Sequence, residues 1–173
     1  MMLPEDVVQI VHVLEKAGID VWLDGGWGVD ALLGQQTRPH DDLDVVISLV
    51  DAEPAKSALA PLGFVVAEDE LPTRFVARDA QDRKVDFHTV SFDSGGGGVQ
   101  QLQDGRAFCY PPEGFAGTGT VDGCRIRCLT PEVQVLVHLG YEPDETDHHD
   151  MRLLQERFGV PLPPLYQNRN ARE

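Results

Sequence analysis

The chain has 173 residues, about the size of one domain, and its 42% apolar content is enough for a sizeable core. Its 14 Lys and Arg against 29 Asp and Glu give a formal net charge of −15, which argues against a nucleic-acid binder that relies on a basic stripe. No apolar run reaches the roughly 20 residues of a membrane span, and the acidic start lacks a leader pattern, so we expect a cytoplasmic protein with reduced cysteines (Cys109, Cys124 and Cys128) as small core residues.

The first half of the chain alternates helices and strands. Pro4 and the two acids after it open a helix, apolar residues recur at helical spacing up to Leu14, and Gly18 ends it. The pattern then predicts a strand over 19–23, a glycine break over 25–28, a short helix over 29–33, a polar loop over 37–41 and a buried strand over 43–47.

The second half begins with strands and ends with helices. The pattern predicts a helix over 52–62, a strand over 64–67, paired strands over 74–78 and 84–90, and a final strand over 125–129. The glycine run 95–98 favours an ordinary long loop over a lid. Helices are predicted from Pro131 to 139 and over 144–158, and the Pro-rich tail after Pro161 is expected to be loosely held.

This element order predicts an α+β fold, with a mixed β-sheet flanked by helices and a small C-terminal helical part. We expect one domain over residues 1–173. Its α/β core would span about 1–130 and its C-terminal helices about 131–160.

Three aspartates lie at strand positions where carboxylates are uncommon. Asp42 and Asp44 are two residues apart on a predicted strand, so they point to the same face and repel each other unless a cation compensates. Asp86 lies on the polar side of another strand and would complete a metal site or take a proton from an attacking hydroxyl. Mg²⁺ prefers such oxygen ligands together with substrate phosphates. His88 lies on the same side as Asp86, and we expect it to have a structural role rather than to bind a metal.

A glycine turn precedes these acids. Gly25 and Gly26 allow the backbone to approach a ligand closely, and the helix after them offers free N–H groups and a positive dipole end. Turn and acids together predict chemistry on a polyphosphate with a divalent metal.

Two stretches carry a resemblance to a known family. Residues 24–30, together with Arg38 and residues 40–44, resemble the signature of the aminoglycoside and lincosamide nucleotidyltransferases of the polymerase-β-like superfamily. The element order is similar, and Asp86 matches the third acid. Residues 138–141 and 145–148 resemble the short lincosamide enzymes more than the aminoglycoside enzymes.

The resemblance implies Mg²⁺-dependent transfer of a nucleoside monophosphate from a nucleoside triphosphate to a hydroxyl, with release of pyrophosphate. Two Mg²⁺ ions and ATP are favoured, although the base leaves no motif. By position, Asp42 and Asp44 would hold the metals, with Asp86 as third ligand or base. The nucleotide site would comprise the glycine turn (Gly25 and Gly26) together with Arg38 and His40. Charge balance for the local acids is an equally good explanation of Arg38.

The acceptor side is acidic. Residues 142–150 follow Tyr141 and include His148, and they hold five acids: Glu142, Asp144, Glu145, Asp147 and Asp150. This pattern indicates either a pocket for a protonated amine or a helix start enriched in acids. The net charge favours a polycationic aminoglycoside, whereas the local pattern favours a lincosamide; we favour the lincosamide. Trp22 and Trp27 are expected to be core or wall residues.

The leading hypothesis is therefore an antibiotic nucleotidyltransferase that confers resistance and, by family analogy, forms a homodimer. The alternatives are an aminoglycoside 2''-adenylyltransferase, a minimal nucleotidyltransferase acting on a protein or metabolite, and a nucleotide-binding module without catalysis. The intact set of three carboxylates argues against the last.

Overall fold

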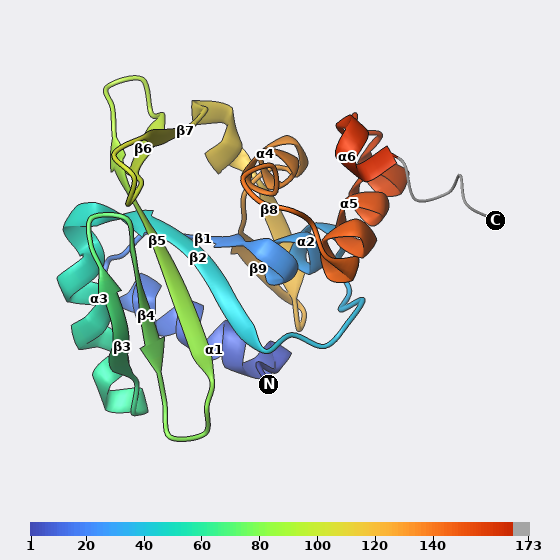
Figure 1. Ribbon diagram of the computed structural model, residues 1–173. Coiled ribbons are helices and arrows are strands. Elements are labelled where there is room, and N and C mark those ends of the chain that lie inside the picture. The colour runs from blue at the N-terminus through green and yellow to red at the C-terminus, as the bar shows by residue number, and fades with distance from the viewer. Residues whose placement is uncertain (168–173) are drawn as a thin grey trace.

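The computed structural model describes residues 1–167, which form helices packed on both faces of a mixed sheet (Figure 1). In chain order the elements are α1 (Pro4–Lys16), β1 (Val21–Asp24), α2 (Gly25–Leu33), β2 (Asp42–Ser48), α3 (Ala52–Leu59), β3 (Val65–Glu70), β4 (Arg74–Arg78), β5 (Lys84–Phe92), β6 (Gly98–Gln101), β7 (Ala107–Tyr110), β8 (Thr118–Val121), β9 (Cys124–Arg127), α4 (Pro131–Val137), α5 (Glu145–Phe158) and α6 (Pro164–Gln167). Short 3₁₀ turns follow β2, α3 and β7. The α+β prediction is confirmed.

The main sheet has the order β1-β2-β5-β4-β3, and the short strands β6 and β7 extend from the end of β5. β2 and β5 are parallel, whereas β1 pairs with β2, and β4 with β5, in antiparallel fashion. β8 and β9 form a separate hairpin.

Alternation along β2 separates the core from the polar face of the sheet. Leu43, Val45 and Ile47 are buried in the cluster that includes α1 and α3 residues. Val46 points the other way, toward a smaller cluster with Trp22 and residues of α4. Because strand side chains alternate, Asp42 and Asp44 share the face of Val46, away from the main core.

The C-terminal helices pack on α2. Val29 lies in a buried cluster with Val135, Met151, Leu154 and residues of the last segment. In Figure 1 these helices lie across the molecule from α1 and α3. None of the described helices combines the length and apolarity that crossing a bilayer requires.

Several sequence predictions are wrong in detail. The glycine stretch is helical rather than a break: α2 begins at Gly25, where the Asp24 side chain caps the chain by accepting the Gly25 N–H at 2.7 Å. Gly98 belongs to β6 rather than to a loop, and β6, β7 and β8 were missed.

The tail and the cysteines also differ from expectation. The segment up to Gln167 is packed, since Tyr166 is buried and its hydroxyl donates to the His138 carbonyl at 2.8 Å. The rest of the tail, 168–173, lies outside the described residues. Cys128 is a core residue as expected, but Cys109 and Cys124 are exposed.

Candidate active site

A cavity of about 780 Å³ lies where the polar face of the sheet meets the β6–β7 hairpin and the α4–α5 connection. Its floor carries acids from three strands. One wall is the start of α2 with Arg38, and the lining also includes Phe108, Tyr110 and Tyr141. It therefore combines charged groups with an aromatic lining, as ligand sites commonly do.

Strand pairing places three carboxylates side by side. Asp24 at the end of β1 is in register with Asp44 of β2, which is in register with Asp86 of the parallel strand β5. Donor atoms of Asp44, Asp86 and His88 all lie within 4.8 Å of one another. Asp42 shares this face but is outside that group: its carboxylate is 3.8 Å from Lys84 Nζ and its side chain is 47% exposed.

Asp44 raises the pKa of the two acids beside it. Burial raises the pKa of Asp86, and the neighbouring Asp44 raises it further, against the lowering effect of His88 and Arg74. Burial and Asp44 likewise raise the pKa of Asp24, against His88. Burial would lower the pKa of His88, but the Asp44 carboxylate, 3.9 Å from its Nε2, and the charges of Asp24 and Asp86 raise it to about 9. The cluster thus carries excess negative charge that favours a cation.

Asp86 is only partly satisfied within the protein. Its Oδ2 accepts a hydrogen bond from Arg74 Nη1 at 2.8 Å, whereas its Oδ1 is buried without a partner in the described chain. A buried carboxylate oxygen without a donor is costly, and a hard cation would supply the missing interaction. The donor set therefore fits magnesium.

The two glycines bring the start of α2 against these residues. Gly25 has a φ of +57°, and a Cβ there would collide with the Asp44 carboxylate. A Cβ on Gly26 would collide with the Arg38 guanidinium and the His40 ring. The first N–H groups of a helix lack intrahelical partners, so close approach here leaves donors facing the cavity.

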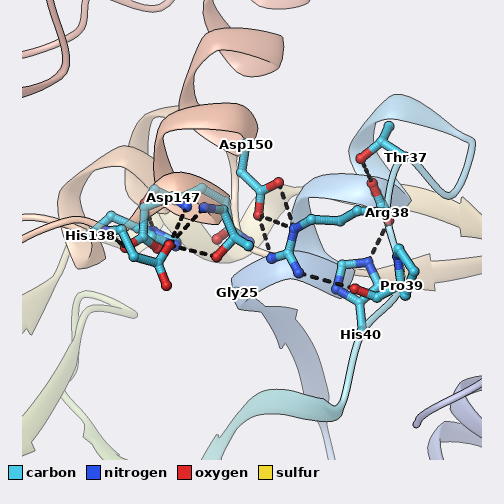
Figure 2. A network of polar contacts seen from close by, with 12 residues as sticks. Gly25, Thr37, Arg38, Pro39, His40, His138, Asp147 and Asp150 are labelled. Atoms are coloured by element: carbon cyan, nitrogen blue, oxygen red, sulfur yellow. Dashed lines mark hydrogen bonds and ion pairs between the residues drawn. The ribbon is translucent and has the colours of Figure 1, made fainter. Parts of the chain in front are cut away.

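Arg38 and His40 occupy different environments in the same loop (Figure 2). Arg38 lines the cavity and forms an ion pair with Asp150 of α5, with Nη2 and Oδ2 2.7 Å apart. His40 is buried, does not line the cavity, and has Nε2 2.6 Å from Asp30 Oδ2. Its ring packs on Trp27, which is itself buried in the core as expected.

The predicted acceptor residues are divided in the same way. Tyr141 and Asp147 line the cavity, and the Tyr141 hydroxyl donates to Asp147 Oδ1 at 3.0 Å. Glu145, the first residue of α5, and His148 lie outside the lining, and the ring of His148 packs against Tyr166.

Several cavity residues were missed from the sequence. Asp24 lies in the stretch 24–30 that carries the family resemblance, and its position at the end of a strand, directly before two glycines, was a signal that could have identified it. Arg74, Gln100 and Tyr110 had none, because strand pairing and distant loops bring them to the cavity. His138 lies in the stretch 138–141 that resembles the lincosamide enzymes, but the sequence assigned it no role. Gln100 Nε2 lies 3.3 Å from His88 Nδ1, and the Tyr110 hydroxyl donates to Gln100 Oε1 at 3.1 Å.

Comparison with known proteins gives consistent results. The family model for aminoglycoside-2''-adenylyltransferase matches residues 6–154. A lincosamide resistance protein of Staphylococcus haemolyticus is 29% identical over 151 residues, covering 87% of this chain and 93% of the relative. A 2''-aminoglycoside nucleotidyltransferase of Klebsiella pneumoniae is 28% identical over 133 residues, covering 77% and 71%.

Solved structures agree with these relatives. The lincomycin-bound crystal structure of the lincosamide antibiotic adenylyltransferase LnuA superposes with a TM-score of 0.78 at 28% identity, covering 87% of this chain and 95% of the other. ANT(2'')-Ia in complex with adenylyl-2''-tobramycin shares the fold, with a TM-score of 0.74 at 20% identity and coverage of 88% and 87%.

Proposed function

The chain belongs to the aminoglycoside-2''-adenylyltransferase family, and we propose that it transfers a nucleoside monophosphate from a nucleoside triphosphate to a hydroxyl of an antibiotic, a lincosamide in preference. One observation carries the proposal: Asp44 and Asp86, in register on parallel strands, share one cavity with Gly25 and Gly26, the first two residues of α2. That arrangement supports a cation site beside an anion site, which transfer from a triphosphate would need.

Asp44 and Asp86 would hold magnesium, two ions by family analogy, with Asp42 from the same strand face. When bound, the ions neutralise phosphate charge and stabilise the attacking and leaving oxygens. The unpartnered Oδ1 of Asp86 supports a role for this residue as a metal ligand. The raised pKa of Asp86 supports the alternative role, in which it takes the proton from the hydroxyl of the antibiotic.

The triphosphate would lie against the start of α2. Gly25 and Gly26 let the helix N-terminus approach the phosphates, and Arg38 would donate to their oxygens. His40, predicted to contact phosphate, would support this wall from behind Gly26, because its ring is buried against Asp30 and Trp27. ATP is the proposed nucleotide.

The acceptor would occupy the side lined by Tyr141 and Asp147. A carboxylate among aromatic and aliphatic side chains suits an antibiotic with one positive charge and apolar groups. The lincosamide relative and the lincomycin-bound structure favour this class. An aminoglycoside is the second candidate, supported by the family model and the net charge of −15. Glu145 and His148 do not line the cavity, so we propose them only as contacts with the antibiotic outside it.

Three further proposals concern the domain organisation, the location and the oligomeric state of the protein. Residues 1–173 would form one catalytic domain, the protein would act in the cytoplasm, and it would be a homodimer by family analogy. Light scattering of the purified protein tests the last, since a monomeric mass would refute it.

The decisive experiment is a mass-spectrometric transfer assay. The protein is incubated with Mg²⁺, mixed nucleoside triphosphates and a panel of lincosamides and aminoglycosides. An acceptor that gains one nucleoside monophosphate identifies the reaction, the base and the drug class together. Absence of any adduct on every drug would refute the proposed acceptor class.

Asp44→Asn provides the mechanistic control. We expect it to abolish turnover while the fold is kept, because the amide retains the shape of the side chain but not the charge that holds a cation. Asp82→Asn is the matched variant: its side chain is 73% exposed in the turn before β5, and turnover should be unchanged. Wild-type turnover by Asp44→Asn would show that the metal assignment is wrong.

A further inference from the structure

Asp150 of α5 is a buried carboxylate that has one charged partner, Arg38, among residues 1–167. The residue is 1% exposed, and Arg38 uses both of its oxygens: Nε donates to Oδ1 at 3.0 Å and Nη2 donates to Oδ2 at 2.7 Å. The two residues are 112 positions apart in the chain. Figure 2 shows the bidentate pair joining α5 to the loop that follows α2.

Stability alone does not explain this pair. The desolvation of a buried ion pair cancels much of its Coulombic gain, and apolar residues of similar volume pack as well or better. Arg38 is also only part-buried, with 23% of its side chain exposed, and it lines the cavity. A bidentate carboxylate instead fixes the plane and direction of a guanidinium.

Counting donors shows what that orientation leaves available. A guanidinium has five N–H groups. Asp150 takes the Nε–H and one Nη2–H, and the Pro39 carbonyl takes one from Nη1 at 3.3 Å. One N–H on each terminal nitrogen remains. Nη2 lies directly over Gly26, in the first turn of α2, where a helix also favours an anion.

We infer that Asp150 is a positioning residue for nucleotide binding: it holds Arg38 over the start of α2 so that its two remaining N–H groups meet the triphosphate. The inference rests on the proposed function, which places the phosphates at this wall. Without the carboxylate, the long Arg38 side chain gains rotamer freedom and its donors leave Gly26.

A double-mutant cycle tests this. Asp150→Asn and Arg38→Ala, alone and combined, are measured for the Kd of Mg·ATP by calorimetry and for the KM of ATP and of the acceptor. We expect each single variant to weaken ATP binding about tenfold or more, with little change in the KM of the acceptor. In the Arg38→Ala background, Asp150→Asn should change the Kd less than twofold, because Asp150 acts through Arg38.

Glu156→Gln is the matched control. Glu156 also lies on α5 and pairs with Arg152 at 3.1 Å, but both side chains are more than half exposed. Its loss removes a carboxylate of the same helix and should leave the Kd unchanged. The inference would be overturned if the effects of the two substitutions on the Kd of Mg·ATP multiply in the double variant. Wild-type ATP binding by Asp150→Asn would also overturn it.

A variant that replaces both charges covers the case in which Asp150→Asn does not fold. Arg38→Met with Asp150→Leu keeps the volume of the pair and should retain a cooperative unfolding transition while ATP binding falls at least tenfold. A folded double variant with wild-type affinity would overturn the inference. If the wild type binds Mg·ATP but modifies no drug, the acceptor proposal fails and the cycle still decides on Asp150; a wild type that binds no Mg·ATP overturns both.

Discussion

Replacing Gly26 by alanine tests whether the close packing at the start of α2 requires glycine. Gly26 has an ordinary helical backbone conformation, so alanine meets no backbone strain and gains up to about 1 kcal/mol of helix propensity. The new methyl group, however, would occupy space filled by the Arg38 guanidinium and the His40 ring. The outcome depends on whether these two side chains can move.

Both neighbours are held in place. His40 is buried, its Nε2 lies 2.6 Å from Asp30, and its ring packs on Trp27 at 4.6 Å between centroids. Arg38 is fixed by Asp150 at 2.7 Å. Overpacking of such a site costs about 1–3 kcal/mol, which exceeds the propensity gain.

After the propensity gain is subtracted, we therefore expect Gly26→Ala to lose about 1 kcal/mol of stability, which lowers the Tm of a chain of this length by about 2–4 °C. The KM for ATP should rise by about tenfold or more, because the methyl group displaces Arg38 and covers the first N–H groups of α2. Calorimetric unfolding and steady-state kinetics measure the two effects separately.

Gly63→Ala is the appropriate comparison. Gly63 has a φ of +87° with open space around its Cβ position, so alanine there meets backbone strain without a collision. It should cost about 1 kcal/mol and leave the KM for ATP unchanged. A Gly26→Ala protein with wild-type Tm and wild-type KM would refute the reasoning about close packing.

Two other variants test the acceptor wall and an ion pair remote from it. Tyr141→Phe removes the hydroxyl that donates to Asp147 at 3.0 Å; since Tyr141 is about half exposed, we expect only a few-fold rise in the KM of the drug, at an unchanged KM for ATP. Burial would raise the pKa of Asp79, but hydrogen bonds from the Arg83 backbone and side chain and from the Gln81 N–H outweigh it and lower this pKa below 3.8. Its contribution to stability is therefore present above pH 3.8 and lost as the pH falls through the lowered value, so urea unfolding should find Asp79→Asn destabilised at pH 7 and the difference from wild type smaller at pH 3. A difference that does not shrink at pH 3 would contradict this assignment.

The acids of the site were predictable because they depend on short-range rules. Period-two alternation places Asp42 and Asp44 on one strand face. Aspartate is uncommon in strands, so Asp86 on the polar side of its strand indicates a functional role. The pairing that brings Asp44 beside Asp86 was not predictable in this way. It is a parallel register reached through α3, β3 and β4, and no local pattern encodes it.

The missed strands have a different cause. β6, β7 and β8 are four residues each, too short for alternation to stand out from the glycines around them. The helical start of α2 was missed because glycine propensity predicts a break, whereas the cap from Asp24 and the neighbours packed against Gly26 and Gly28 stabilise a helix there. Tertiary contacts outweighed local preference at the position where the site needs glycine.

Helix α5 shows why the C-terminal helices belong to the site. Asp147 and Asp150 are three residues apart, hence on the same face of the helix. Asp147 lines the cavity beside Tyr141, and Asp150 holds Arg38 beside Gly26. One helical turn thus contacts both the proposed acceptor wall and the proposed phosphate wall. A boundary drawn near residue 130 would separate Arg38 from the carboxylate that orients it, so removing the helices should impair nucleotide binding as well as acceptor binding.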